Sequence, residues 1–142
     1  MSAQAAIIIP KYSNPDKVYQ SKYCIIWEVK KDFAWFPADK IYINKEFEAK
    51  LFIAFKNLEA KGLHTEINTF DGCFVQRPVR GMSVPSLHSW AMAIDLNAAT
   101  EKLSQEKTNW TDEFVNTMES AGLYWGGTWH RKDSMHFALY NG

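Results

Sequence analysis

The stretch SLHSWAMAID, residues 86–95, sets a histidine and an aspartate among small and apolar residues. Its second half, continued to WAMAIDLN (90–97), predicts a buried β-strand. Side chains alternate between the two faces of a strand, so Asp95 is expected to share a face with the small residues Ala91 and Ala93. A buried carboxylate is costly unless another group pairs with it. This stretch therefore predicts both a core strand and a polar site on that strand.

A second stretch, DSMHFAL (133–139), presents the same combination near the C-terminus. It predicts a terminal strand in HFAL (136–139), with His136 and Ala138 on one face. In a flat strand Asp133 would diverge from His136, so we expect Asp133 at the bend that enters the strand, aimed at the same cavity. His88 precedes the first strand and can fold back over the space above the alanines.

Two imidazoles and a carboxylate around a small-residue pocket match the requirements of a catalytic zinc site, which takes three protein ligands and leaves one position for water. His88, Asp95 and His136 are the candidate ligands, although other divalent metals tolerate such a set. Asp133 is the candidate general base. Each residue alone has a more ordinary interpretation as a structural or exposed group, and the interpretation depends on their combination.

The remaining chain predicts a single α+β domain over residues 1–142, with a small antiparallel sheet and flanking helices. Helices are expected at 44–62, capped by Asn44, and at 111–123, capped by Thr111. Further strands are expected in YCIIWEV (23–29) and HTEINTF (64–70), and a loop in DGCFVQRPVRG (71–81). Residues 1–34 are expected to form a peripheral N-terminal layer.

Composition excludes several classes of protein. The 142 residues are 46% hydrophobic, and 16 basic side chains balance 16 acidic ones, which predicts a packed domain rather than a nucleic-acid binder. The two cysteines are too few for a disulfide framework and fit a reducing compartment. The sequence shows no signal peptide or membrane-spanning segment, so we expect synthesis in the host cytoplasm and no membrane insertion. A monomer is expected.

The two histidine stretches together resemble the paired signatures of peptidase family M15, the zinc D,D-peptidases. SLHSWAMAID is similar to the S-x-H-x-x-G-x-A-x-D signature, and DSMHF is similar to the second signature. The flanking stretches IYINKEF, GCFVQRPVRG and GLYWGGTW are most similar to the phage L-alanyl-D-glutamate endopeptidase (endolysin) branch. The resemblance extends from about Trp35 to the C-terminus and implies a hedgehog/D,D-peptidase-like fold.

The resemblance assigns roles residue by residue. It implies zinc held by His88, Asp95 and His136, and Asp133 as general base. It further implies that Arg77 stabilises the oxyanion that forms when water attacks, with Arg80 as its nearby competitor. Ser86 matches a family serine that orders the loop or contacts substrate, and His130 is a candidate substrate contact. His64 is expected to be structural or exposed.

One position departs from the family signature, because Ala91 stands where the family has glycine. A methyl group fits there if the backbone φ angle is negative, whereas a positive φ would loosen the ligand geometry.

The resemblance implies a zinc peptidase acting on peptidoglycan stem peptides, with L-Ala–D-Glu as the expected bond, in a phage or prophage endolysin. Such a lysin would act on the cell wall or periplasm after release from the cytoplasm. The alternatives are a D-Ala-D-Ala carboxypeptidase or dipeptidase, and a non-catalytic wall-binding or virion module.

Overall fold

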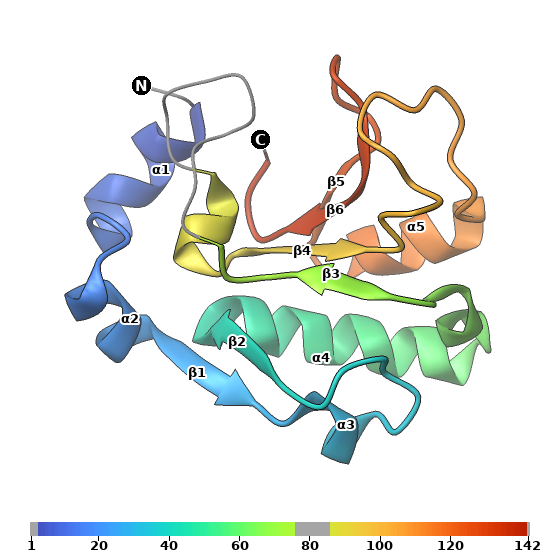
Figure 1. Cartoon of the computed structure of the whole chain (residues 1–142), viewed down its shortest axis with the longest axis horizontal. Coiled ribbons are helices and arrows are strands. Elements are labelled where there is room, and N and C mark those ends of the chain that lie inside the picture. Colours follow the sequence, from blue (N-terminus) through green and yellow to red (C-terminus); the bar gives the residue numbers. More distant parts are fainter. Residues whose placement is uncertain (1–2, 76–85, 142) are drawn as a thin grey trace.

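A computed structural model describes residues 3–75 and 86–141 of the chain (Figure 1). The predicted α+β class is confirmed: helices are mixed with one four-stranded and one two-stranded antiparallel sheet. In chain order the elements are α1 (Ala3–Tyr12), α2 (Lys17–Tyr23), β1 (Cys24–Trp27), α3 (Val29–Asp32), β2 (Ile41–Asn44), α4 (Lys45–Ala60), the 3₁₀ turn η1 (Leu63–Glu66), β3 (Phe70–Gly72), the 3₁₀ turn η2 (Leu87–Trp90), β4 (Ala93–Leu96), α5 (Asp112–Ser120), β5 (Tyr124–Gly126) and β6 (Asp133–Ala138).

The four-stranded sheet has the order β3-β4-β6-β5, so β4 and β6 are its two central strands. They pair antiparallel, with Asp95 directly opposite His136 and Ala93 opposite Ala138. Figure 1 shows α4 running along this sheet, with the β1–β2 pair on its other side. The apolar face of α4 is buried, and its members are Phe47, Leu51, Ala54, Phe55 and Leu58. The sheet thus fixes two predicted site residues as neighbours across one strand pair.

Both predicted helix caps are present. The Asn44 side chain accepts hydrogen bonds from the backbone N–H groups of Glu46 and Phe47, 2.9 and 3.0 Å away. Thr111 accepts from the N–H of Phe114 at the start of α5. These side chains satisfy backbone donors that have no partner inside the helix, which is why both helices begin where the sequence predicts.

Three expected strands differ in extent from the prediction. The strand expected over 23–29 is β1, Cys24–Trp27, because Val29 already begins α3. The stretch 64–70 was expected to be a strand, but η1 occupies its first part and β3 begins only at Phe70. The Asn97 side chain accepts the N–H groups of Asn68 and Thr69, which are therefore not available to a strand ladder. The terminal strand begins at Asp133, three residues earlier than expected.

The strand expected over 90–97 is also shorter, because β4 begins only at Ala93. Trp90 ends η2, and Ala91 follows in the left-handed region with φ 54° and ψ 37°. Ala91 therefore does not lie on the Asp95 face of β4. The departure from the family glycine falls on a backbone conformation that glycine adopts more readily than alanine.

Residues 1–34, expected as a peripheral layer, form α1, α2, β1 and α3 and contribute to the common core. Tyr19, Trp27 and Val29 are all buried in it. Both cysteines are free thiols, with Cys73 buried and Cys24 partly so. The N-terminal segment is thus packed against the part of the chain that carries the predicted site.

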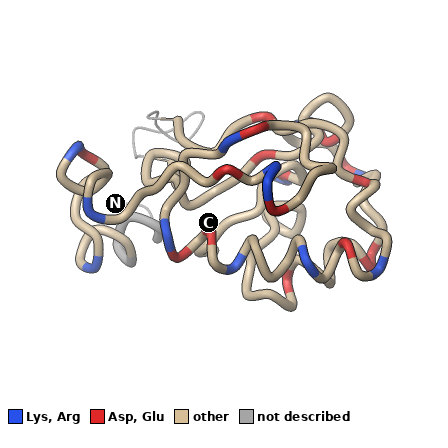
Figure 2. Tube along the Cα trace, turned by 90° about the horizontal axis from the view of Figure 1, so that it is seen from below, with Lys and Arg blue, Asp and Glu red and all other residues tan. Residues whose placement is uncertain are grey.

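Acidic and basic side chains are interspersed along the described chain (Figure 2). Among the described helices, none has the length and continuous apolar character needed to cross a bilayer.

Ala91→Gly is expected to raise the free energy of unfolding by about 0.5 kcal/mol. Relief of the left-handed alanine contributes about 1–2 kcal/mol, and the added freedom of the unfolded chain removes about 0.4–1 kcal/mol. Urea denaturation measures the change. Ala93→Gly is the control, because it places glycine inside β4 and should lower stability. An Ala91→Gly protein destabilised as much as the control would contradict the strain at Ala91.

Candidate metal centre

Three elements bring the predicted ligands together. His88 lies on η2, Asp95 on β4 and His136 on β6. Asp95 and His136 face each other because they are paired residues of adjacent strands. His88 comes from a turn that packs against the same end of the sheet, where its carbonyl oxygen accepts the N–H of Val75. The sequence places these residues 48 positions apart at most, and the sheet register closes that separation.

The Asp95 carboxylate lies between the two imidazoles. Its Oδ2 is 3.3 Å from Nε2 of His88, and its Oδ1 is 3.5 Å from Nδ1 of His136. One potential ligand atom from each of the three residues lies within 4.8 Å of the other two. The imidazole rings are nearly perpendicular, with centroids 5.2 Å apart. This is a compact set of two nitrogens and one oxygen, the donor set of a catalytic zinc site.

The orientation of His88 is fixed on its far side. Its Nδ1 lies 2.9 Å from the carbonyl oxygen of Cys73, which can only accept a hydrogen bond. Nδ1 therefore donates this hydrogen bond, and Nε2 is the ring nitrogen that faces Asp95. A metal-bound histidine usually donates its other N–H to such a partner. Ser86 caps η2 by accepting the backbone N–H of His88 at 3.3 Å, so Ser86 orders the turn that carries the ligand.

Three buried atoms of this cluster have no hydrogen-bond partner among the described residues: Nε2 of His88, Oδ1 of Asp95 and Nε2 of His136. Buried polar atoms are normally paired, because an unsatisfied one costs about 1–3 kcal/mol. Burial opposes ionisation of Asp95, but the adjacent imidazoles of His136 and His88 outweigh it and hold the pKa of the carboxyl well below its usual range. An ionised carboxylate beside unpaired imidazole nitrogens fits a divalent cation.

Asp133 reaches the same place from the first position of β6. Its Oδ2 is 3.8 Å from Nδ1 of His136, so the predicted convergence of these two side chains is observed. Residues three apart in a regular strand point to opposite faces. Here the pairing of β5 with β6 is irregular, because Trp125 pairs with Phe137 but the next residue, Gly126, pairs with Asp133. A Cβ atom on Gly126 would lie 2.4 Å from the Asp133 carbonyl oxygen, so only glycine allows this approach.

Two tryptophans hold the segment between Asp133 and His136. The indole N–H groups of Trp110 and Trp125 both donate to the carbonyl oxygen of Ser134, each at 2.8 Å. Neither tryptophan is among the site residues predicted from the sequence. A buried indole needs a hydrogen-bond acceptor for its N–H, so the sequence indicates that each tryptophan requires a partner. The sequence does not indicate that this partner is the Ser134 carbonyl oxygen.

The other predicted site residues lie in different places. Arg77 and Arg80 are outside the described residues. His130 is exposed between β5 and β6, and His64 lies on η1 with its ring 5.2 Å from that of Trp35. Trp129, which the sequence analysis did not single out, has its ring centroid 5.0 Å from that of His136.

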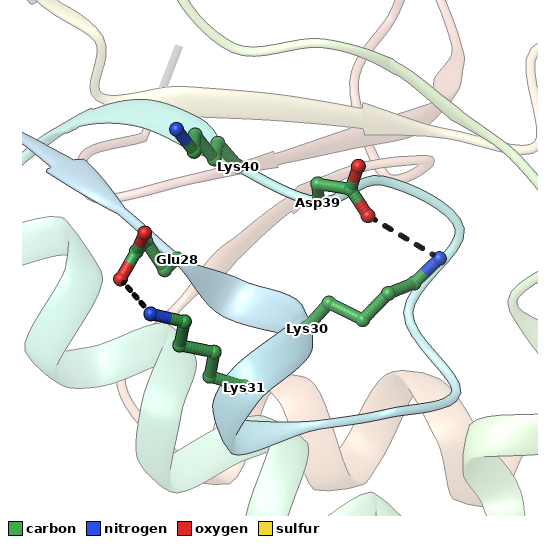
Figure 3. Close-up of a pocket in the computed structure, with 5 residues that line it drawn as sticks. All are labelled: Glu28, Lys30, Lys31, Asp39 and Lys40. Carbon is green, nitrogen blue, oxygen red and sulfur yellow. Dashed lines mark ion pairs between the residues drawn. The ribbon is translucent and has the colours of Figure 1, made fainter.

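A separate surface hollow of about 370 Å³ adjoins α3. None of its lining residues belongs to the cluster of His88, Asp95 and His136, called the metal cluster here. Figure 3 shows its two ion pairs, Lys31 with Glu28 at 2.8 Å and Lys30 with Asp39 at 3.7 Å. These are exposed pairs, which contribute little to stability. The hollow therefore does not compete with the buried cluster as a candidate catalytic site.

A comparison with known protein families gives a match over part of the chain. A family model for M15 peptidases, described as D-alanyl-D-alanine carboxypeptidase, matches residues 80–139. No curated protein and no solved structure gives a significant match to the chain. The matched stretch contains all three candidate ligands and Asp133, and it includes Arg80 but not Arg77. The comparison thus supports the M15 peptidase family for the part of the chain that carries the metal cluster.

Proposed function

We propose that this protein is a zinc-dependent peptidase that hydrolyses the stem peptide of peptidoglycan. One observation carries the proposal: the Asp95 carboxylate and two imidazoles converge in a buried cluster, in which one atom of each residue has no hydrogen-bond partner among the described residues. The match of residues 80–139 to M15 peptidases supports the same chemistry.

His88, Asp95 and His136 would hold the zinc, which when bound polarises the scissile carbonyl and activates a water molecule. Asp133 lies on the same side of His136 as Asp95 and is the base that takes a proton from the attacking water. The same carboxyl then delivers that proton to the leaving amine nitrogen. Arg77 stabilises the developing oxyanion in this proposal, with Arg80 as the alternative cation.

The bond that we propose is L-Ala–D-Glu, in a phage or prophage endolysin that is made in the host cytoplasm and acts on the cell wall after release. The resemblance of the stretches flanking the metal ligands to the endolysin branch supports this choice. The description of the matched family favours a second candidate, cleavage of the terminal D-Ala-D-Ala bond. A carboxypeptidase must bind a free terminal carboxylate, whereas an endopeptidase must accept chain on both sides of the bond.

The wild-type protein is expected to bind one zinc ion, and zinc should raise its melting temperature. Binding to the folded state alone stabilises it by about 2.7 kcal/mol when free zinc is 100-fold above Kd. Asp95→Asn should weaken binding by more than the roughly 10–100-fold that loss of an outer-shell partner costs. Competition titration and thermal melts measure both effects. Asp112→Asn, an exposed aspartate on α5, is the control, and equal loss in both variants would argue against a site at Asp95.

Asp133→Asn keeps the shape of the side chain but removes the base. Turnover is expected to fall by about 100- to 10,000-fold, the usual contribution of a general acid–base group. Zinc stoichiometry should be unchanged, because Asp133 is not one of the three proposed ligands. Glu119→Gln, an exposed carboxylate on α5, should retain full turnover. Unchanged turnover in Asp133→Asn would remove Asp133 from the mechanism.

Digestion of purified sacculi is expected to release peptides with new N-terminal D-Glu, detected by amino-group labelling and mass spectrometry. Chelation should abolish the release and added zinc should restore it. Release of D-Ala without new D-Glu termini would assign the carboxypeptidase activity instead. A zinc-loaded protein that cleaves neither bond would favour a non-catalytic wall-binding or virion module, and cleavage that a chelator does not affect would contradict the role of the metal.

A further inference from the structure

We propose that Tyr19 and Asn44 are positioning residues for His88, because they hold the carbonyl groups that end its turn. This inference rests on the proposed metal centre and extends it to a part of the chain outside the family match, which begins at residue 80. We call these two hydrogen-bonded side chains the Tyr–Asn bridge.

Tyr19 is the first half of the bridge. Its side chain is 1% exposed, and its hydroxyl donates to the carbonyl oxygen of Trp90 at 2.6 Å. Trp90 is the last residue of η2, two positions after His88. Burial raises the pKa of Tyr19 above its usual range, so the hydroxyl keeps its proton and remains a donor at neutral pH.

Asn44 is the second half. Its Nδ2 donates to the Tyr19 hydroxyl oxygen at 2.9 Å, while its backbone N–H donates to the carbonyl oxygen of Ala91 at 3.0 Å. Its Oδ1 is already occupied by the cap of α4. Asn44 is also buried, and so is its hydrogen bond to the Tyr19 hydroxyl. Asn44 thus ties the start of α4 to the turn that carries a proposed ligand, directly through its backbone N–H and by way of Tyr19 through its side chain.

The turn has a physical need for such support. Ala91 holds a left-handed conformation that is unfavourable for alanine, and a four-residue 3₁₀ turn has few hydrogen bonds of its own. The carbonyl oxygen of Trp90 accepts from Tyr19, and that of Ala91 accepts from the backbone of Asn44. The Ala91 oxygen also accepts from the Cys73 thiol at 3.7 Å. The Trp90 indole N–H also donates to the carbonyl oxygen of Ser13, 3.0 Å away, directly after α1.

The position of the turn decides the position of the ligand. Nε2 of His88 lies 3.3 Å from Asp95 only while η2 keeps Nδ1 within reach of the Cys73 carbonyl oxygen. Without the bridge, the buried Trp90 carbonyl loses its donor and the turn can leave its strained form. The metal would then have to order the turn on binding, which weakens the measured affinity.

The test compares Tyr19→Phe with Tyr12→Phe. Tyr12 is a matched control, because it is also a buried tyrosine of the N-terminal segment whose hydroxyl makes a hydrogen bond, in this case to Glu46 at 2.9 Å. Its bonds do not reach η2. The probe is Co²⁺, whose visible absorption reports both affinity and the geometry of the ligands. Thermal melts of the metal-free proteins report stability separately.

Tyr19→Phe is expected to bind Co²⁺ about tenfold more weakly than wild type, the lower end of outer-shell effects, with an altered absorption spectrum. Tyr12→Phe should bind with wild-type affinity and spectrum even if it melts at a lower temperature. Asn44→Asp is the second variant and keeps an oxygen for the helix cap. It loses the amide donor and offers the tyrosine hydroxyl a competing acceptor, so it should also weaken Co²⁺ binding. This variant keeps the inference testable if Tyr19→Phe does not fold.

The outcomes separate this inference from the proposed function. Wild-type affinity and spectrum in Tyr19→Phe or in Asn44→Asp would overturn the positioning role and leave the metal centre standing. Equal losses in Tyr19→Phe and Tyr12→Phe would also overturn it, because a general loss of stability would then explain the result. A wild-type protein that binds neither Co²⁺ nor zinc would overturn the metal centre and this inference together.

Discussion

The structure of the site depends on the pairing of Asp95 with His136 across β4 and β6. This register sets a carboxylate beside an imidazole in the interior of the sheet, where both would be poorly accommodated without a further partner. His88 completes the cluster from η2, and Asp133 approaches from the irregular start of β6. A shift of the register by one residue would turn Asp95 to the other face of the sheet, and the cluster would no longer exist.

Several side chains around the site donate hydrogen bonds to backbone carbonyl groups and not to other side chains. The carbonyl groups of Cys73, Trp90 and Ser134 accept hydrogen bonds from a histidine, a tyrosine and two tryptophans respectively. The Cys73 carbonyl binds His88 directly. Trp90 lies in the same turn as His88, and Ser134 lies in β6 between Asp133 and His136. Buried donors that find a single acceptor fix a backbone in one place, which a site that must hold three ligands at once requires.

The N-terminal segment has a larger part in this arrangement than its sequence indicates. It was expected as a peripheral layer, but Tyr19 and Trp27 lie in the common core, and Tyr19 contacts the turn that carries His88. The family match covers the site and not this segment. The ligands and the structure that supports one of them therefore come from opposite ends of the chain.

The sequence by itself determined the mixed fold class, the two capped helices and the identity of the clustered residues. These features follow from local rules: apolar periodicity, capping side chains, and polar residues set in strands that must be buried. It did not determine that 64–66 forms a turn, that Ala91 has a positive φ, or that Trp110 and Trp125 share one acceptor. Only the tertiary structure decided these, because each depends on a partner distant in sequence, such as Asn97 for the backbone of 68–69. Spacing along a chain shows which groups need a partner, and only the packed fold shows which partner is within reach.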